Sequence, residues 1–164
     1  ECSHDGEVVV AANFNAPDQT VISGSEAAVK RAAEKLPAAG AKRVIPLKVS
    51  GAFHSPLMQK AAEGMKAELE KAKFSDARFP VICNVTAQAE TKGAAFKDLL
   101  YRQLFSPIRW VESFEKALPG TAAEMGPGKV LAGLVQRINP NIKVLPAHTP
   151  QEIEAAIQSF REMP

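Results

Sequence analysis

The chain has 164 residues, of which 46% are hydrophobic, so it is long enough to bury one ordinary core. Twenty basic and eighteen acidic side chains leave a net charge of +2, which gives no electrostatic reason to expect nucleic acid as a partner. No apolar run is long enough to span a membrane and no secretory signal stands out, so we expect a cytoplasmic protein. Cys2 and Cys83 lack metal-ligand spacing, and we expect reduced structural thiols and no metal site.

The first part of the chain predicts two strands followed by a helix and a further strand. Strand-like segments at residues 8–12 and 20–22 flank a turn rich in Asn, Pro and Asp. Ser23 and Glu26 have the spacing of a capping box at a helix start. The buried face of this helix would consist of Val29, Ala33 and Leu36. Residues 44–49 are apolar enough to predict the next strand.

A histidine follows at the start of another expected helix. His54 stands directly before Ser55, a favoured N-cap residue, and Pro56, a favoured first helical residue. The apolar side chains that follow at helical spacing are Met58, Ala62, Met65, Leu69 and Ala72. Histidine is the commonest general acid or base in enzymes, so this position is a candidate for catalysis. The alternative is a surface histidine at a bend between a strand and a helix.

The remaining segments alternate between strand and helix patterns, which is typical of an α/β protein. We expect strands at 79–85, 122–125 and 142–145. Helices are indicated by the apolar sets Phe96, Leu99, Leu100 and Leu104; Trp110, Val111, Phe114 and Leu118, ending at Pro119; Val130, Leu131, Leu134, Val135 and Ile138; and Ile153, Ala156, Ile157 and Phe160. Thr149 and Glu152 predict a capping box for the last helix.

Five motifs in order give the chain a resemblance to malonyl-CoA:acyl carrier protein transacylases, a family of acyltransferases of fatty acid synthesis. They are NFNAPDQ at 13–19, AKR at 41–43, GAFHS at 51–55, YRQLFSP at 101–107 and EMGPGKVL at 124–131. The family carries its nucleophilic serine in a Gly-x-Ser-x-Gly turn upstream of the histidine, and no such pentapeptide occurs here. The resemblance therefore implies a C-terminal portion that is inactive alone and whose partner is the missing N-terminal half.

The resemblance also implies a fold and a division of the chain. Residues 1–48 would form part of a ferredoxin-like small subdomain, and residues 49–164 the C-terminal part of a large α/β-hydrolase-like subdomain. Both subdomains would be incomplete.

The implied chemistry is transfer of malonyl from coenzyme A, through a serine ester, to the phosphopantetheine thiol of an acyl carrier protein. His54 would be the general base and acid, and the backbone carbonyl of Gln103 would orient its ring. The CoA thioester is a substrate, and no permanently bound cofactor is expected. Without the resemblance, Gln103 would be interpreted as an exposed helix residue.

Substrate-binding residues also follow from the resemblance. Asn13 and Asn15 match positions that reach the CoA or pantetheine arm, and Arg43 and Arg137 match positions that meet CoA phosphates. Phe53 beside His54 would crowd an α-branched acyl group and so favour malonyl over methylmalonyl. Each position has a simpler alternative: local backbone bonding by turn amides, solvated surface arginines, and a phenylalanine that fills the core.

Two other classes of function stay open at this point. A non-catalytic module that binds the carrier protein or CoA would use Asn13, Arg43 and Arg137 without needing a nucleophile. An unrelated α/β interaction domain would make His54 no more important than His148.

Overall fold

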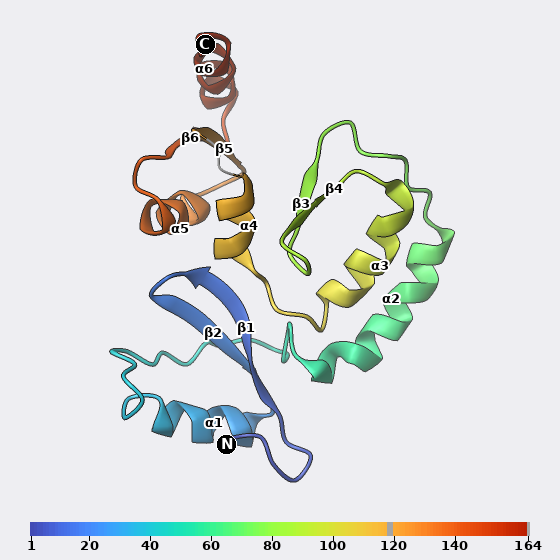
Figure 1. Cartoon of the computed structure of the whole chain (residues 1–164), viewed down its shortest axis with the longest axis vertical. Coiled ribbons are helices and arrows are strands. Elements are labelled where there is room, and N and C mark those ends of the chain that lie inside the picture. Colours follow the sequence, from blue (N-terminus) through green and yellow to red (C-terminus); the bar gives the residue numbers. More distant parts are fainter. Residues whose placement is uncertain (118–119, 164) are drawn as a thin grey trace.

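The computed structural model describes residues 1–117 and 120–163, so the expected helix end at Leu118 and Pro119 lies outside the described residues. The architecture is mixed α/β, as predicted, with three two-stranded sheets and the helices packed around them (Figure 1). The elements are β1 (Val9–Ala16), β2 (Gln19–Gly24), α1 (Glu26–Lys35), the 3₁₀ helix η1 (Pro56–Met58), α2 (Gln59–Lys71), β3 (Val81–Cys83), β4 (Gln88–Glu90), α3 (Gly93–Gln103), α4 (Trp110–Ala117), β5 (Thr121–Met125), α5 (Val130–Ile138), β6 (Lys143–Ala147) and α6 (Pro150–Arg161).

The strands β1 and β2 form an antiparallel hairpin, which confirms the two predicted strands and extends them. The capping box predicted for Ser23 and Glu26 is wrong, because Ser23 pairs with Val10 inside the hairpin. Ser25 is the N-cap residue of α1 instead, and its hydroxyl donates to the carbonyl of Val8 at 3.3 Å. The fully buried side chains of α1 are Ala28 and Ala32, whereas the predicted face of Val29, Ala33 and Leu36 is only half-buried.

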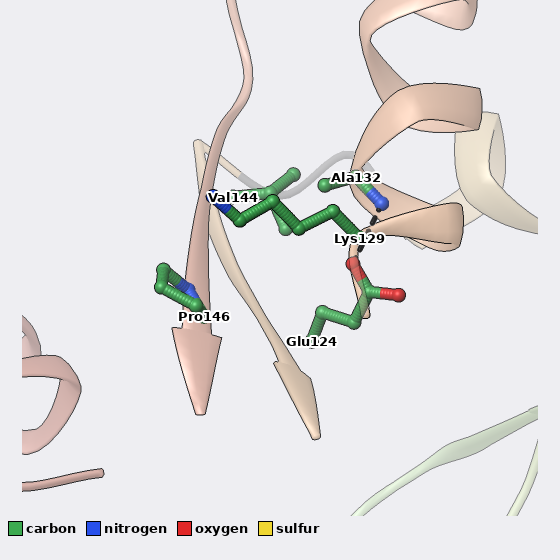
Figure 2. A pocket seen from close by; sticks show the side chains of 5 residues that line it. All are labelled: Glu124, Lys129, Ala132, Val144 and Pro146. Atoms are coloured by element: carbon green, nitrogen blue, oxygen red, sulfur yellow. Dashed lines mark hydrogen bonds between the residues drawn. The ribbon is translucent and has the colours of Figure 1, made fainter. Parts of the chain in front are cut away.

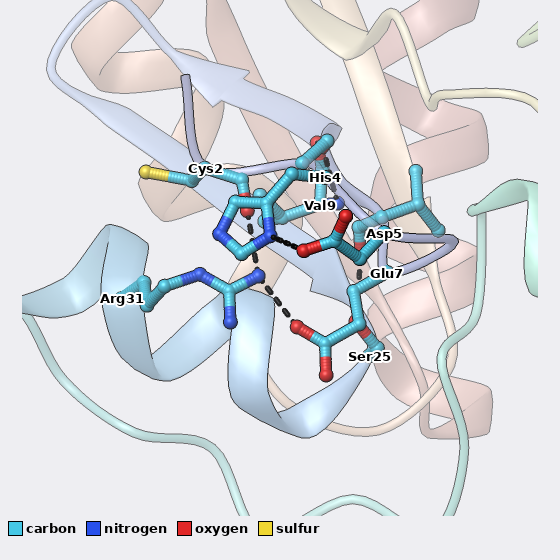
Figure 3. A network of polar contacts seen from close by, with 9 residues as sticks. Cys2, His4, Asp5, Glu7, Val9, Ser25 and Arg31 are labelled. Carbon is cyan, nitrogen blue, oxygen red and sulfur yellow. Dashed lines mark hydrogen bonds and ion pairs between the residues drawn. The ribbon is translucent and has the colours of Figure 1, made fainter.

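A polar network holds the N-terminal residues against α1 (Figure 3). The guanidinium of Arg31 forms an ion pair with Glu7 at 2.6 Å and donates to the carbonyl of Cys2 at 2.9 Å. The Nδ1 atom of His4 lies 3.0 Å from the carboxylate of Asp5. His4 thus belongs to this N-terminal network and is not one of the predicted site residues.

The strand predicted at residues 44–49 is wrong. This segment is irregular, and its apolar side chains are open to solvent, with Val49 66% exposed. An extended segment gains ladder hydrogen bonds only when a neighbouring strand supplies the partner groups. No strand pairs with residues 44–49 within the described part of the chain.

The helices α2 and α3 lie side by side next to the β3–β4 hairpin (Figure 1). The start of α3 is fixed by Asp76, which accepts from the backbone N–H of Gly93 at 2.9 Å and pairs with Lys92 at 3.0 Å. Both contacts favour the carboxylate, so the pKa of Asp76 lies below its usual value. A side chain at position 93 would meet the Phe74 carbonyl at 2.6 Å, which explains the glycine there.

The C-terminal part follows the predicted order of strands and helices. Parallel strands β5 and β6 are connected through α5, and α6 packs against β6 at the end of the molecule (Figure 1). The capping box of Thr149 and Glu152 is confirmed. On the predicted apolar face of α6, only Ala156 is fully buried, whereas Ile157 and Phe160 are exposed because the described elements do not cover that side of the helix.

The core is built from small side chains. Eight alanines are buried, together with Cys83, Leu99, Val135 and Ile142. Burial raises the pKa of the Cys83 thiol, and the Glu90 carboxylate adds to this effect. Many larger apolar side chains stay open, including Phe79 at 72% exposure. Large apolar side chains on several segments therefore face solvent.

Candidate active site

His54 lies in the loop that leads into η1 and adopts a left-handed backbone conformation with φ of +59°. Its backbone N–H donates to the carbonyl of Leu104 at 3.0 Å. A non-glycine residue in this conformation is uncommon and persists when its surroundings determine it strongly. The start of the helix at Ser55 and Pro56 was predicted, but the Ser55 hydroxyl does not cap it. That hydroxyl is fully buried and donates to the Ala52 carbonyl at 2.7 Å.

The imidazole ring of His54 is fixed by a second backbone group. Its Nδ1 atom lies 2.9 Å from the carbonyl oxygen of Gln103, the atom expected to orient it. A carbonyl can only accept, so in this hydrogen bond Nδ1 carries the proton. The neutral ring then has an unprotonated Nε2 that can accept a proton. The catalytic role of this pair remains a prediction.

The end of α3 is connected to the strand that carries the predicted asparagines. Ile108 donates its backbone N–H to the Ala12 carbonyl at 2.8 Å and accepts from the N–H of Phe14 at 2.9 Å. Asn13 and Asn15 themselves lie within β1 and are half-buried. The interpretation of them as turn amides is therefore wrong. Ile108 therefore connects β1, which carries Asn13 and Asn15, to the segment whose carbonyls bond His54.

The two predicted arginines lie on different segments of the chain. Arg43 is exposed in the irregular segment that precedes residue 44. Arg137 on α5 binds the carboxylate of Asp18 in the β1–β2 turn, with its Nε at 3.0 Å, and also contacts Gln19. The sequence could not have indicated Asp18 as the partner, because 119 residues separate it from Arg137. A phosphate at Arg137 would have to compete with this carboxylate.

Phe53, the predicted specificity residue, is 48% exposed directly before His54. The Leu104 carbonyl, which fixes the backbone of His54, was not predicted because a main-chain acceptor leaves no signal in residue type. The structure thus groups Phe53, His54 and Gln103, and it joins Asn13 to them through Ile108.

A small cavity of about 110 Å³ lies elsewhere, between β5, β6 and α5 (Figure 2). Its lining consists of Glu124, Lys129, Ala132, Val144 and Pro146, and none of the predicted site residues contributes to it. Among residues 1–117 and 120–163, no group of three or more His, Cys, Asp or Glu side chains is placed to hold a metal ion. Over the same residues, no helix is both long and apolar enough to cross a bilayer.

The chain is similar to known proteins along almost its whole length. The family model of the acyl transferase domain matches residues 2–145. The chain is 45% identical over 163 residues to the malonyl CoA-acyl carrier protein transacylase of Bacillus subtilis, and 43% identical over 157 residues to that of Escherichia coli K12. These matches cover 98% and 94% of this chain but 51% of each relative, so the chain spans about half the length of the curated relatives it matches.

Solved structures show the same similarity in three dimensions. An acyl carrier protein S-malonyltransferase from Vibrio cholerae matches with a TM-score of 0.88 and 42% identity, over 93% of this chain and 51% of that one. A malonyl-transacylase solved in complex with a type II polyketide synthase acyl carrier protein matches with a TM-score of 0.88 and 37% identity, over 94% of this chain and 51% of its own. The chain therefore belongs to the acyl transferase domain family.

Proposed function

We propose that this chain supplies the histidine part of a malonyl-CoA:acyl carrier protein transacylase active site in fatty acid synthesis. The observation that carries the proposal is the contact between His54 Nδ1 and the Gln103 carbonyl at 2.9 Å, in a chain of the acyl transferase domain family. This contact orients the ring and leaves Nε2 as the atom that exchanges a proton.

The reaction proceeds in two acyl transfers. A serine from outside these residues attacks the thioester carbonyl of malonyl-CoA while His54 Nε2 takes the serine proton. The tetrahedral intermediate expels the CoA thiolate, which receives that proton from His54, and a malonyl-serine ester remains. The phosphopantetheine thiol of the carrier protein then gives its proton to His54 and attacks the ester. The serine oxygen leaves and is reprotonated by His54, so no resident cofactor is required.

The serine would come from a polypeptide segment that packs against the open apolar surface. Between residues 45 and 57, five large apolar side chains are exposed: Ile45, Leu47, Val49, Phe53 and Leu57. Burying such side chains against another segment releases about 25 cal/mol per Å² of apolar area. This segment would be the other half of the acyltransferase domain. In the complete domain, residues 1–48 of this chain belong to the small subdomain and residues 49–164 to the large one.

Asn13 and Asn15 are proposed to bind the pantetheine arm, and Arg43 and Arg137 the CoA phosphates. The asparagines lie on the strand that is bonded to Ile108, so they are held in a fixed relation to the histidine. The guanidinium of Arg137 is bonded to Asp18, so a CoA phosphate would bind there in competition with this carboxylate. A carrier protein is the second substrate, as for the similar malonyl-transacylase that was solved with one.

The test is a chimera in which the upstream half of the Bacillus subtilis relative precedes residue 1. We expect it to convert malonyl-CoA and carrier protein to malonyl carrier protein and free CoA, whereas the present chain alone does not. Mass spectrometry of the carrier protein measures the product. A soluble chimera that binds carrier protein without transferring malonyl would instead support a non-catalytic binding module.

Phe53→Ser in this chimera is expected to relax the choice of acyl group. Removing the ring opens space beside His54 for an α-methyl group, and one methyl group in an apolar pocket changes selectivity by about 10- to 200-fold. We expect the malonyl to methylmalonyl ratio of kcat/KM to fall by about tenfold or more. Leu57→Ser, a similarly exposed position, is the matched control. An equal ratio in wild type and Phe53→Ser would reject the specificity role.

A further inference from the structure

The segment that holds His54 is itself clamped by an arginine outside the predicted site. We call residues 103–109 the strap, because they run from the end of α3 to the start of α4 and carry the carbonyls of Gln103 and Leu104. The backbone of Ile108 bonds the strap to β1. Its last residue, Arg109, makes the side-chain contacts that fix its other end.

The guanidinium of Arg109 links the start of α4 to the β3–β4 turn, two parts of the chain that are distant in sequence. Its Nε and Nη2 atoms donate to the two carboxylate oxygens of Glu112 at 2.8 and 2.6 Å. Its Nη1 atom donates to the carbonyls of Thr86 at 3.1 Å and Val85 at 3.4 Å in the β3–β4 turn. A bidentate arginine–carboxylate pair has a fixed geometry. The pair with Glu112 therefore orients the guanidinium so that its Nη1 atom faces this turn.

The turn and the histidine loop both contain backbone that needs such support. Ala87 in the β3–β4 turn has φ of +52° and is fully buried, and His54 has φ of +59°. Non-glycine residues stay in this region only where surrounding contacts over-determine them. Arg109 donates to the carbonyls of the two residues before Ala87. At the other end of the strap, two carbonyls accept hydrogen bonds from His54.

We infer that Arg109 is a positioning residue, which clamps the strap to the β3–β4 turn and thereby holds the two carbonyls that fix His54. The inference rests on the proposed function for its catalytic meaning, but the clamp itself is a property of this chain. The Nε, Nη1 and Nη2 atoms of Arg109 are all bonded within the protein, so we assign the residue no contact with substrate and an action through the Gln103 and Leu104 carbonyls. The ion pair with Glu112 alone would have little effect, but the same guanidinium also bonds two carbonyls of the β3–β4 turn.

The test measures the order of His54 in the isotopically labelled chain without any assay of transfer. Arg109→Gln removes the fork and the charge, and Arg109→Lys keeps the charge but cannot span carboxylate and carbonyls together. We expect exchange of the His54 amide hydrogen to become about tenfold faster in both variants. The ¹⁵N shifts of the two ring nitrogens are expected to move toward each other as the Nδ1–H tautomer loses its preference.

The matched control is Arg31→Gln, which removes another arginine that pairs with a glutamate and donates to a main-chain carbonyl (Figure 3). It should leave the exchange rate and ring shifts of His54 unchanged. Equal effects of Arg31→Gln and Arg109→Gln, or no effect of either, would overturn the inference. If Arg109→Gln does not fold, Glu112→Gln decides: a smaller change in the same direction supports the clamp, and wild-type values reject it.

The two proposals can fail separately. If the chimera lacks transferase activity while Arg109→Gln still frees His54, the clamp stands and the proposed function is wrong. If the chimera is active and His54 stays ordered in every Arg109 variant, the proposed function stands and the clamp is wrong.

Discussion

His54→Ala is expected to lower malonyl transfer by the chimera about 10²- to 10⁴-fold, the range that general acid–base catalysis contributes. The same imidazole serves both half-reactions, so release of CoA and loading of the carrier protein should fall together. The side chain is assigned to proton transfer and not to substrate binding, so the loss should appear in kcat with little change in KM. Steady-state kinetics with each substrate varied in turn measures both constants.

The control is His148→Ala, which changes a histidine in the loop before α6 whose backbone N–H donates to Glu152. This variant should transfer malonyl at the wild-type rate. A retained rate in His54→Ala, or an equal loss in both variants, would mean that His54 is not the base. Unfolding midpoints of the two variants separate lost chemistry from lost structure.

Local patterns predicted most of the helices because their signals lie within one or two turns of chain. The apolar spacing of α3 and α5 and the capping box of α6 needed no tertiary information. The capping box at Ser23 failed because Ser23 was drawn into the β1–β2 hairpin, and an N-cap was available two residues later. Pairing with a strand overrode a local capping signal.

Strands were predicted less well because each depends on a partner. Residues 44–49 have an apolar pattern but no neighbouring strand among the described residues. The strand β4 shows the opposite case. Its sequence, Gln-Ala-Glu, does not predict a strand, yet the segment pairs with β3 across the turn. The β-propensity of a residue reflects how well its side chain packs on a sheet. It does not indicate whether a partner strand is present.

His54 was a candidate from its local sequence, but the rest of the site was predictable only through the family resemblance. The two atoms of the His54–Gln103 contact come from residues 49 positions apart, and one of them is a main-chain carbonyl. No spacing rule indicates such a pair. The partners of Arg109 in the β3–β4 turn are likewise main-chain carbonyls, so their recognition required the folded geometry.

Glu124→Ala is expected to lower the free energy of unfolding of this chain by about 2–4 kcal/mol. Glu124 lies at 9% exposure on β5, where one carboxylate oxygen accepts from the N–H of Leu131 and the other from that of Ala132, each at 2.9 Å. Figure 2 shows the bond to Ala132. Lys129, the N-cap residue of α5, provides no side-chain cap of its own. Alanine would therefore leave two N–H groups of the first turn without the carboxylate that accepts from them.

Urea unfolding followed by the fluorescence of Trp110, the only tryptophan of the chain, measures this loss. Glu124→Gln is a second variant of nearly the same size. Its amide keeps one oxygen acceptor but turns an NH₂ group toward the second backbone N–H, so it should also destabilise, by less than alanine. Wild-type stability in both variants would show that the buried carboxylate does not support α5.

Glu152→Gln provides the comparison between a buried and an open helix start. Glu152 also accepts from two backbone N–H groups, those of Thr149 and His148, and these bonds hold its pKa below the usual value. Its contribution to stability is therefore present above the pKa of the unfolded chain and is lost as the pH falls through the lowered pKa of the folded state. Water can replace the glutamate at this open site, so we expect a smaller loss at neutral pH than for the matched variant Glu124→Gln. An equal loss in both variants would mean that burial does not set the strength of the Glu124 cap.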